Sequence, residues 1–470
     1  MKKILLTMVI ILTTLHFAAP TLLGFSIWQL GSAVSVSTGM SAKLACSAKY
    51  ITGLSNSQII EDLSSYSPAV RVVNLDYDNN NKIVTASLMG MAKTSAQFRS
   101  GLGCSLIMGD SNTLDSVVVP PLSASNAQWP AGNTVETINP NIQNLVTTLV
   151  EQDNSNNLNT RAMLVIKNGE IIAQSYGDGF NETTPLLGWS MGKSVTAIML
   201  GRMQQLDMVT MSKADLFKEW QHDDRQEITL KQLLQMSSGL TFDETYAPGS
   251  DATAMLFTAP SASNVAMQSP LTNKPGSHFS YSSGTTNILT RFMHDQMGAS
   301  TQADINFLFQ EIFQPLGMQN SIFETDSSGV FVGSSYIYAS GQDWARLGLL
   351  MLNNGLVNYI DNKGVTHQRQ LLPSDWVKQA SQPNSSNNDS RYGYQFWLNS
   401  GSSDNNQKND ENNQLRWPSL PLDAYAMMGN RQQSVMIIPS ENTVLIRIGW
   451  TKGSYPLDKN YATILNALKG

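Results

Sequence analysis

The stretch Gly188-Trp189-Ser190-Met191-Gly192-Lys193 decides how this chain is interpreted, and the apolar run that follows it, residues 194–200, predicts a helix. If the helix begins at or just before Ser190, the three-residue spacing places the Ser190 hydroxyl and the Lys193 ammonium on one helix face. A serine becomes a nucleophile beside a base, and a lysine is that base when burial or a neighbouring cation keeps it neutral. The spacing therefore indicates an activated serine, with a capped helix and a surface lysine as the ordinary alternative.

The same stretch also fits G-x-S-x-G, the strand-to-helix turn that carries the nucleophile in α/β-hydrolases. That fold needs a buried strand directly before Gly188, but the apolar run there is short and Pro185 interrupts it. It also needs a catalytic histidine late in the chain, and no histidine follows His367. His278 and His294 could take the place of that catalytic histidine, but packing or a position on a helix surface explains each of them equally well. We therefore favour the serine-lysine pair and keep the α/β-hydrolase as the alternative.

Composition limits the classes of function. The chain has 470 residues, 41% hydrophobic and 14% charged, so it can bury a large core in two or three domains. Its formal charge of -6 and the lack of a basic run with interleaved aromatic residues argue against a nucleic-acid binder. The five histidines and two cysteines show no metal-ligand spacing. We expect no metal or other cofactor.

We expect residues 1–33 to be a signal peptide or an uncleaved membrane anchor. Lys2 and Lys3 give the segment a positive start, and a largely apolar run extends from residue 4 to about residue 30. No A-x-A cleavage site is evident, and the run is close to the roughly 20 residues that span a bilayer, which favours an anchor with its lysines in the cytoplasm. In either case the remainder is exported to the periplasmic or extracytoplasmic side.

Export determines how the two cysteines are interpreted, because it places them in an oxidising compartment. Cys46 and Cys104 lie 58 positions apart in a region, residues 34–135, that shows no chemistry of its own. In an oxidising compartment such a pair predicts a disulfide, which would stabilise the fold by roughly 3 to 4.5 kcal/mol on the chain-entropy model. The alternative is two buried free thiols. Strands are predicted at 70–75 and 82–88, so we interpret this part as a small accessory region.

Residues 136–470 predict an α+β domain. A hairpin with an Asn-Gly turn precedes the serine helix, mostly helical patterns occupy about 201–350, and strands return before a final helix. The predicted hairpin strands are 161–166 and 170–177, the later strands are 392–398, 434–439 and 443–450, and the helices include 230–236, 286–297, 341–352 and 457–468. The serine is then expected where the sheet meets the helical part.

A serine-lysine pair needs a second proton carrier beside it. The stretch Tyr281-Ser282-Ser283 resembles the Y-x-N or Y-x-S element of class C β-lactamase-like serine hydrolases, a superfamily that also carries S-x-x-K. Further stretches resemble the branch that includes 6-aminohexanoate-dimer hydrolase, namely 233–240, 338–348, 371–377 and 392–394. The resemblance covers about residues 140–470. It implies a β-lactamase/transpeptidase-like fold, with an antiparallel sheet flanked by helices and an all-helical subdomain.

The resemblance also implies roles for the site residues. Ser190 would attack the carbonyl of an ester or amide and form an acyl-enzyme. Lys193 and Tyr281 would relay the proton of the serine to the leaving group, with the lysine cation lowering the pKa of the tyrosine. Ser283 would bond to Lys193 or to the substrate. The substrate would be a small molecule or a short peptide-like ester or amide.

The third element of the superfamily departs from pattern here. In place of K-T-G or H-x-G the chain has residues 428–434, and Gln432 occupies the second glycine position of the G-x-x-G-Q usual in the branch. We expect the backbone N–H groups of Asn430, after Gly429, and of Ser190 to form an oxyanion hole. Arg431 would meet a substrate anion or stay solvated. The missing K-T-G favours an esterase or small amidase over a β-lactamase or D,D-peptidase.

Three residues after the 233–240 block are candidates for the substrate pocket: Asp243, Glu244 and Tyr246. A capping acid in a helix-connecting loop explains Asp243 or Glu244 equally well. An inactive member that keeps the fold as a binding module is a further alternative, and Gln432 is its only support in the sequence. The oligomeric state is left open by the sequence.

Overall fold

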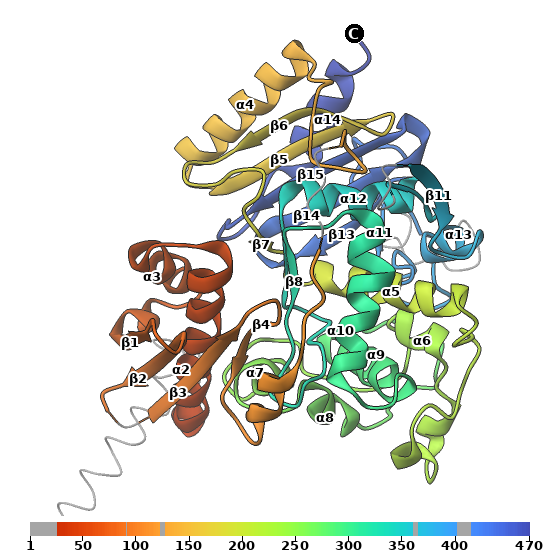
Figure 1. Ribbon diagram of the computed structural model, residues 1–470. Coiled ribbons are helices and arrows are strands. Elements are labelled where there is room, and N and C mark those ends of the chain that lie inside the picture. The colour runs from red at the N-terminus through yellow and green to blue at the C-terminus, as the bar shows by residue number, and fades with distance from the viewer. Residues whose placement is uncertain (1–25, 91, 123–126, 361–364, 402–414) are drawn as a thin grey trace, which may run out of the picture.

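The computed structural model describes residues 26–90, 92–122, 127–360, 365–401 and 415–470, so most of the predicted signal or anchor segment lies outside the described residues. Within those ranges, no helix has both the length and the apolar character needed to cross a bilayer. Figure 1 shows an N-terminal part beside a larger body, in which a sheet with helices on both faces stands above a mostly helical part.

The N-terminal part packs α2 (Leu30–Ser47) across a four-stranded antiparallel sheet, with α3 (Asn56–Ser64) beside them. The strands are β1 (Val73–Asp78), β2 (Ile83–Leu88), β3 (Ala92–Arg99) and β4 (Gly103–Leu106). The strand predicted at 70–75 begins three residues later, because Pro68 opens a short 3₁₀ turn, Pro68–Val72. The following turn forms where Asp78 accepts the N–H groups of Asn80 and Asn81.

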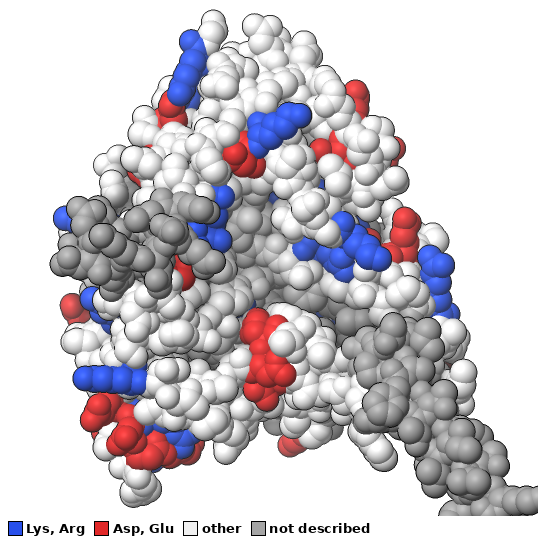
Figure 2. Space-filling view, turned by 180° about the vertical axis from the view of Figure 1, so that it is seen from behind, with Lys and Arg blue, Asp and Glu red and all other residues white. Residues whose placement is uncertain are grey.

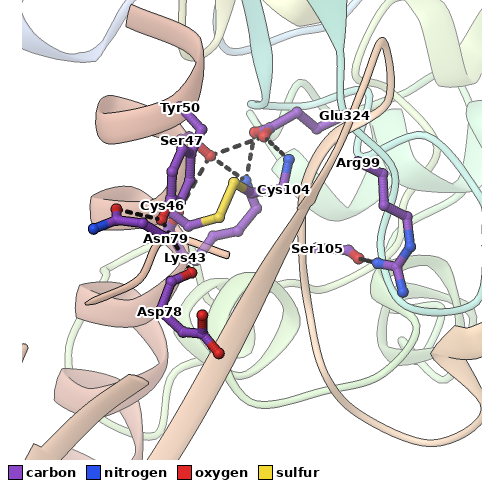
Figure 3. Close-up of a disulfide and its surroundings, with 10 residues drawn as sticks. All are labelled: Lys43, Cys46, Ser47, Tyr50, Asp78, Asn79, Arg99, Cys104, Ser105 and Glu324. Carbon is purple, nitrogen blue, oxygen red and sulfur yellow. Dashed lines mark hydrogen bonds and ion pairs between the residues drawn. A yellow bond between two sulfur atoms is a disulfide. The ribbon is translucent and has the colours of Figure 1, made fainter. Parts of the chain in front are cut away.

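Cys46 of α2 and Cys104 of β4 form the predicted disulfide, and both residues are buried (Figure 3). The helix that carries Cys46 also approaches the larger body closely. A Cβ atom on Gly39 would lie 2.0 Å from the carbonyl oxygen of Phe257 at the end of α7 (Asp251–Phe257). The backbone of α2 therefore packs directly on the body, which only a glycine permits at this point.

Six strands form the main sheet in the order β12-β13-β14-β15-β5-β6, and every neighbouring pair is antiparallel. They are β5 (Thr160–Lys167), β6 (Glu170–Tyr176), β12 (Trp397–Leu398), β13 (Tyr425–Gly429), β14 (Gln433–Ile438) and β15 (Thr443–Gly449). Helices α4 (Pro140–Ser155) and α14 (Leu457–Ala467) cover one face, and α5 (Met191–Gln205) and α12 (Gly341–Leu352) cover the other (Figure 1). The α+β fold class is confirmed.

The stretch 201–350 is mostly helical but departs from an all-helical subdomain in two ways. Its helices are α6 (Leu230–Leu234), α7, α8 (Ala262–Met267), α9 (Ser283–Gln296), α10 (Thr301–Phe307) and α11 (Gln314–Leu316). Strands β8 (Ser321–Phe323) and β9 (Ile337–Ala339) form a small antiparallel sheet with β7 (Leu186–Leu187). Helix α12 lies on the main sheet, where Gly348 allows close contact with Val435 and Val444.

The aromatic run 392–398 is a strand only at its end, in β12. Gln395 has a left-handed φ of 62°, and its side-chain amide donates to the carbonyl oxygens of Leu233 and Leu234 at the end of α6. This buried link between distant segments replaces the predicted strand. The remaining elements are the hairpin β10 (Leu356–Ile360) and β11 (Thr366–Gln370), and α13 (Trp376–Ala380).

Candidate active site

Ser190 stands at the start of α5, after a sharp turn. Trp189 has a left-handed φ of 49°, and Ser190 follows as the residue before the helix. The Ser190 hydroxyl makes no capping bond to the helix backbone, and its Oγ lies 3.1 Å from Nζ of Lys193. Lys193 is only 1% exposed. The alternative of a capped helix with a surface lysine is therefore wrong.

Lys193 is surrounded by oxygen atoms. Besides Ser190, Nζ lies 2.9 Å from Oγ of Ser283 and 3.1 Å from the carbonyl oxygen of Ser334. Burial lowers the pKa of Lys193 to about 8, and the negative charge of Glu244 opposes this by raising it. An amine with such a pKa is neutral for part of the time near neutral pH, as a base toward a serine hydroxyl must be.

Tyr281 faces the same pair of residues. Nζ of Lys193 lies 4.9 Å from the centre of the Tyr281 ring, which stacks on Trp397 at 5.2 Å. Burial raises the pKa of Tyr281, while its hydrogen bond with Ser190 lowers it and the charge of Glu244 raises it. The pKa of Tyr281 is therefore raised overall, not lowered as expected, because loss of water around the phenol outweighs the other effects. The phenol stays protonated, and the lysine is the group whose proton is held less tightly.

Of the three pocket candidates in the loop after α6, Glu244 and Tyr246 reach the site. One carboxylate oxygen of Glu244 accepts the Ser283 N–H at 2.7 Å. The other accepts the Ser283 hydroxyl at 2.5 Å and the Tyr246 hydroxyl at 3.1 Å. Ser283 is the first residue of α9, where free N–H groups and the helix dipole favour a negative charge.

Asp243 does not reach the cleft, which corrects the expectation for this residue. Its carboxylate accepts the N–H of Thr245 at 3.0 Å, and its own N–H donates to Asp251 at 2.8 Å. Its side chain is exposed, and it is not among the residues that line the cleft. Two adjacent acids in a loop point in different directions, and no periodicity in the sequence tells which one faces inward.

The end of β13 forms the third wall of the site. A Cβ atom on Gly429 would lie 2.1 Å from the carbonyl oxygen of Gly188, so the strand can meet the turn that carries Ser190 only with glycine here. The next residue, Asn430, lines the cleft together with Ser190. Among the described residues, no backbone carbonyl of a turn, loop or cap accepts the backbone N–H of Ser190 or of Asn430. Two such donors beside a candidate nucleophile are suited to a developing oxyanion.

The turn after Asn430 explains how the chain tolerates glutamine in place of glycine. Arg431 and Gln432 have φ angles of 62° and 66°, the left-handed region that glycine adopts most easily. The Gln432 amide donates to the carbonyl oxygen of Gly453 at 2.7 Å, and Gln432 does not line the cleft. Glutamine at position 432 therefore adopts a backbone conformation that is less favourable for it than for glycine. Because its side chain does not line the cleft, it does not narrow the path of a substrate to β13.

These walls enclose an open cleft of about 360 Å³. It is lined by Ser190, Glu244, Tyr246, Tyr281, Trp397, Arg416, Trp417, Met428, Gly429 and Asn430. Figure 2 shows this face, hollowed between the sheet and the helical part, with acidic side chains at the lower edge of the hollow. The cleft combines an apolar wall with one acid and one basic side chain, Arg416, which lies 4.4 Å above the ring of Trp397.

Packing explains the G-x-S-x-G match. A Cβ atom on Gly188 would lie 2.3 Å from the Trp344 ring, and one on Gly192 would lie 2.8 Å from the carbonyl oxygen of Gly333. The strand before the turn, β7, has two residues and pairs antiparallel with β9. An α/β-hydrolase turn follows a strand of the central sheet instead. The confirmed fold excludes that alternative.

The three histidines considered for a triad do not line the cleft. His294, on α9, pairs with Asp304 at 2.6 Å, and His367, on β11, stacks on Tyr359. His278 lies 3.4 Å from the side-chain nitrogen of Asn388. Each has a local structural partner, as the sequence indicates.

The profile of the family described as Beta-lactamase matches residues 142–466, well over half of the chain. No curated protein matches the chain.

Solved structures share the fold at low identity. A putative 6-aminohexanoate-dimer hydrolase from Bacillus anthracis is 21% identical, with a TM-score of 0.51, over 75% of this chain and 88% of that one. A family VIII carboxylesterase is 12% identical, with a TM-score of 0.52, over 71% and 100% of the two chains. A penicillin-binding protein homolog from Caulobacter crescentus is 14% identical, with a TM-score of 0.50, over 72% and 99%. The chain belongs to the β-lactamase family.

Proposed function

We propose that the chain is a serine hydrolase that cleaves an ester or amide bond through an acyl-enzyme on Ser190. The observation that carries this proposal is the 3.1 Å distance between Nζ of Lys193 and Oγ of Ser190, with the lysine buried and its pKa lowered to about 8. An amine at this distance takes the serine proton as the hydroxyl oxygen attacks the carbonyl carbon.

The neighbouring groups supply the other steps. Tyr281 is protonated in the resting enzyme and is hydrogen-bonded with Ser190, so it gives its proton to the leaving group and becomes a phenolate. Ser283 and the carbonyl oxygen of Ser334 hold the lysine ammonium while it carries the serine proton. The N–H groups of Ser190 and Asn430 bind the oxyanion, and removal of one such donor costs roughly 10² to 10³ in rate. Water then attacks the acyl carbon and gives a proton to the Tyr281 phenolate, while the oxygen of Ser190 leaves and takes back its proton from Lys193.

The lining of the cleft supports a small-molecule or short peptide-like substrate. Trp397, Trp417 and Met428 offer an apolar wall to an acyl or leaving group, and the cleft is open to solvent. No K-T-G stands on β13, so we propose an esterase or small amidase ahead of a β-lactamase or D,D-peptidase.

We also propose that the enzyme is exported and held at the extracytoplasmic face by its N-terminal segment. The Cys46–Cys104 disulfide supports export, because disulfides persist in oxidising compartments and are rare in the cytosol. Anchoring rests on the apolar run and the two lysines at the start of the sequence.

A fluorophosphonate probe tests the proposed function. The purified full chain is incubated with the probe, digested, and mapped by mass spectrometry, and the label is expected on Ser190 and absent from Ser190→Ala. A screen of p-nitrophenyl esters, nitrocefin and D-amino-acid peptides then ranks substrate classes, with esters expected to be cleaved fastest. A folded wild-type protein that takes no label would contradict the proposal.

A further inference from the structure

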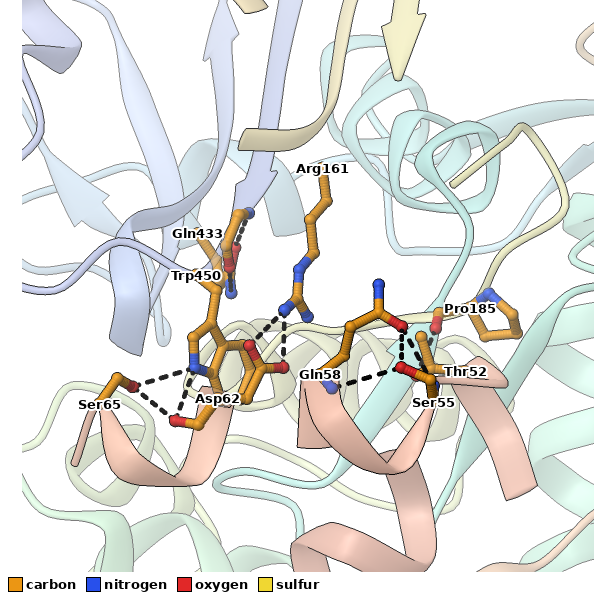
Figure 4. A network of polar contacts seen from close by, with 10 residues as sticks. Thr52, Ser55, Gln58, Asp62, Ser65, Arg161, Pro185, Gln433 and Trp450 are labelled. Carbon is orange, nitrogen blue, oxygen red and sulfur yellow. Dashed lines mark hydrogen bonds and ion pairs between the residues drawn. The ribbon is translucent and has the colours of Figure 1, made fainter. Parts of the chain in front are cut away.

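The N-terminal part is fixed to the main sheet through polar contacts at the end of α3 (Figure 4). Both carboxylate oxygens of Asp62, on α3, accept hydrogen bonds from Arg161 of β5 at 2.6 Å. The indole N–H of Trp450, just after β15, donates to the carbonyl oxygen of Asp62 and to Oγ of Ser65, each at 3.1 Å. The end of α3 is therefore held at one place on the sheet.

A second buried link fixes the other side of the N-terminal part (Figure 3). Lys43 and Ser47 of α2 both bind the carboxylate of Glu324, and Lys43 and Glu324 are 2% and 0% exposed. Nζ of Lys43 also lies 3.9 Å from the centre of the Tyr336 ring. Because a buried pair of charges requires good geometry, this contact holds α2 in a fixed position.

The segment that follows α3 carries Tyr66 to the back of the catalytic site. Its ring packs edge-on against Trp189 at 6.1 Å and against Trp450 at 5.7 Å. The guanidinium of Arg431 lies over the ring, 3.8 Å from its centre. Tyr66 thus contacts Trp189, which precedes Ser190, and Arg431, which follows Asn430.

Both of these neighbours have unusual backbone conformations. Trp189 and Arg431 have φ angles of 49° and 62°, which residues with a Cβ atom adopt only where the surroundings hold them. Trp189 sets the position of the Ser190 hydroxyl and N–H, and Arg431 sets that of the Asn430 N–H. A ring that contacts both side chains restricts both turns together.

We propose that Tyr66 is a positioning residue of the active site, which holds the nucleophile turn through Trp189 and the oxyanion turn through Arg431. The inference rests on the proposed function. It makes the accessory region an integral part of the hydrolase. The effect belongs to the aromatic ring, because the ring makes the contacts with the indole groups and the guanidinium.

The experiment uses the full chain and two readouts, the rate constant for fluorophosphonate labelling of Ser190 and kcat and KM for p-nitrophenyl butyrate. Tyr66→Ala is expected to lower the labelling rate and kcat by about tenfold or more, with KM within about twofold, because displaced reacting groups lose rate steeply. Tyr66→Phe keeps the ring and is expected to retain at least half of the wild-type rate. Arg431→Met is expected to lower both rates, and its effect should not add to that of Tyr66→Ala.

Tyr50→Ala is the matched control. Tyr50 lies in the same N-terminal part and packs on Phe98 at 5.7 Å, so its loss removes a ring without touching either turn. The proposal is overturned if Tyr66→Ala is no slower than Tyr50→Ala, or if Tyr66→Phe is as slow as Tyr66→Ala. Should Tyr66→Ala fail to fold, wild-type rates in Arg431→Met overturn it. Labelling that persists in Ser190→Ala refutes the proposed function instead, which separates the two failures.

Discussion

Glu244 accepts two hydrogen bonds from Ser283, at 2.7 Å from the backbone N–H and 2.5 Å from the hydroxyl, and that hydroxyl lies 2.9 Å from Nζ of Lys193. One serine therefore links a carboxylate to the lysine that we propose as the base. Burial lowers the pKa of the lysine and the carboxylate raises it, and the balance is about 8. The charge on the base is set jointly by its burial and by this acid.

The rate of acylation should rise with pH. Lys193 acts as a base when neutral, and its pKa is about 8, so the labelling rate is expected to increase from pH 6 through a midpoint near 8 and then level off. The raised pKa of Tyr281 keeps the phenol protonated over this range. Labelling rates at constant ionic strength check this, and a rate that falls with rising pH would argue against a lysine base.

Glu244→Gln should move that midpoint to lower pH. The variant removes a negative charge that raises the pKa of Lys193 and keeps the shape of the side chain. Asp243→Asn is the matched control, because this neighbouring acid bonds within its own loop, does not line the cleft, and should leave the profile unchanged. The pH profile of the labelling rate is the measurement, and equal shifts in both variants would contradict the account of Glu244.

Tyr281→Phe should lower kcat by roughly 10² to 10⁴, the usual contribution of a positioned acid-base group. The ring still stacks on Trp397 in this variant, so thermal unfolding should change little. Steady-state kinetics with p-nitrophenyl butyrate and calorimetry check both parts. Near-normal kcat would remove Tyr281 from the proton relay.

Loss of the disulfide should destabilise the N-terminal part. Cys46 and Cys104 are 58 residues apart, and opening a loop of this size costs roughly 3 to 4.5 kcal/mol on the chain-entropy model. The double variant Cys46→Ser/Cys104→Ser should therefore unfold at lower urea than the oxidised wild type. An unchanged urea midpoint would show that the packing of α2 on the sheet suffices without the covalent link.

The main features of the site could be predicted from the sequence because they are local or recur as motifs. Ser190 and Lys193 are one helical turn apart, and Tyr281 and Ser283 belong to one short element at the start of α9. The hairpin of β5 and β6 was predictable from its Asn-Gly turn.

The remaining features depend on contacts between distant segments. The sequence could not tell whether Glu244 or Asp243 faces the cleft, because the direction of a loop side chain is set by its contacts in the folded chain. For Glu244 that contact is Ser283. Arg431 and Tyr66 are far apart in the sequence, and neither residue type predicts that the guanidinium lies over the ring. The link from Gln395 to the end of α6 likewise replaces a strand that the local pattern favours.

The central claim is that Lys193 activates Ser190, and the labelling rate of Ser190 in Lys193→Met tests it most directly. Methionine keeps an unbranched, apolar side chain in a buried site and removes the amine, so the variant should fold with stability close to that of the wild type. We predict that the rate constant for labelling falls by at least about 10²-fold at pH 8, while the residual label still maps to Ser190. An unchanged rate, or a label on another residue in the wild type, would contradict the account.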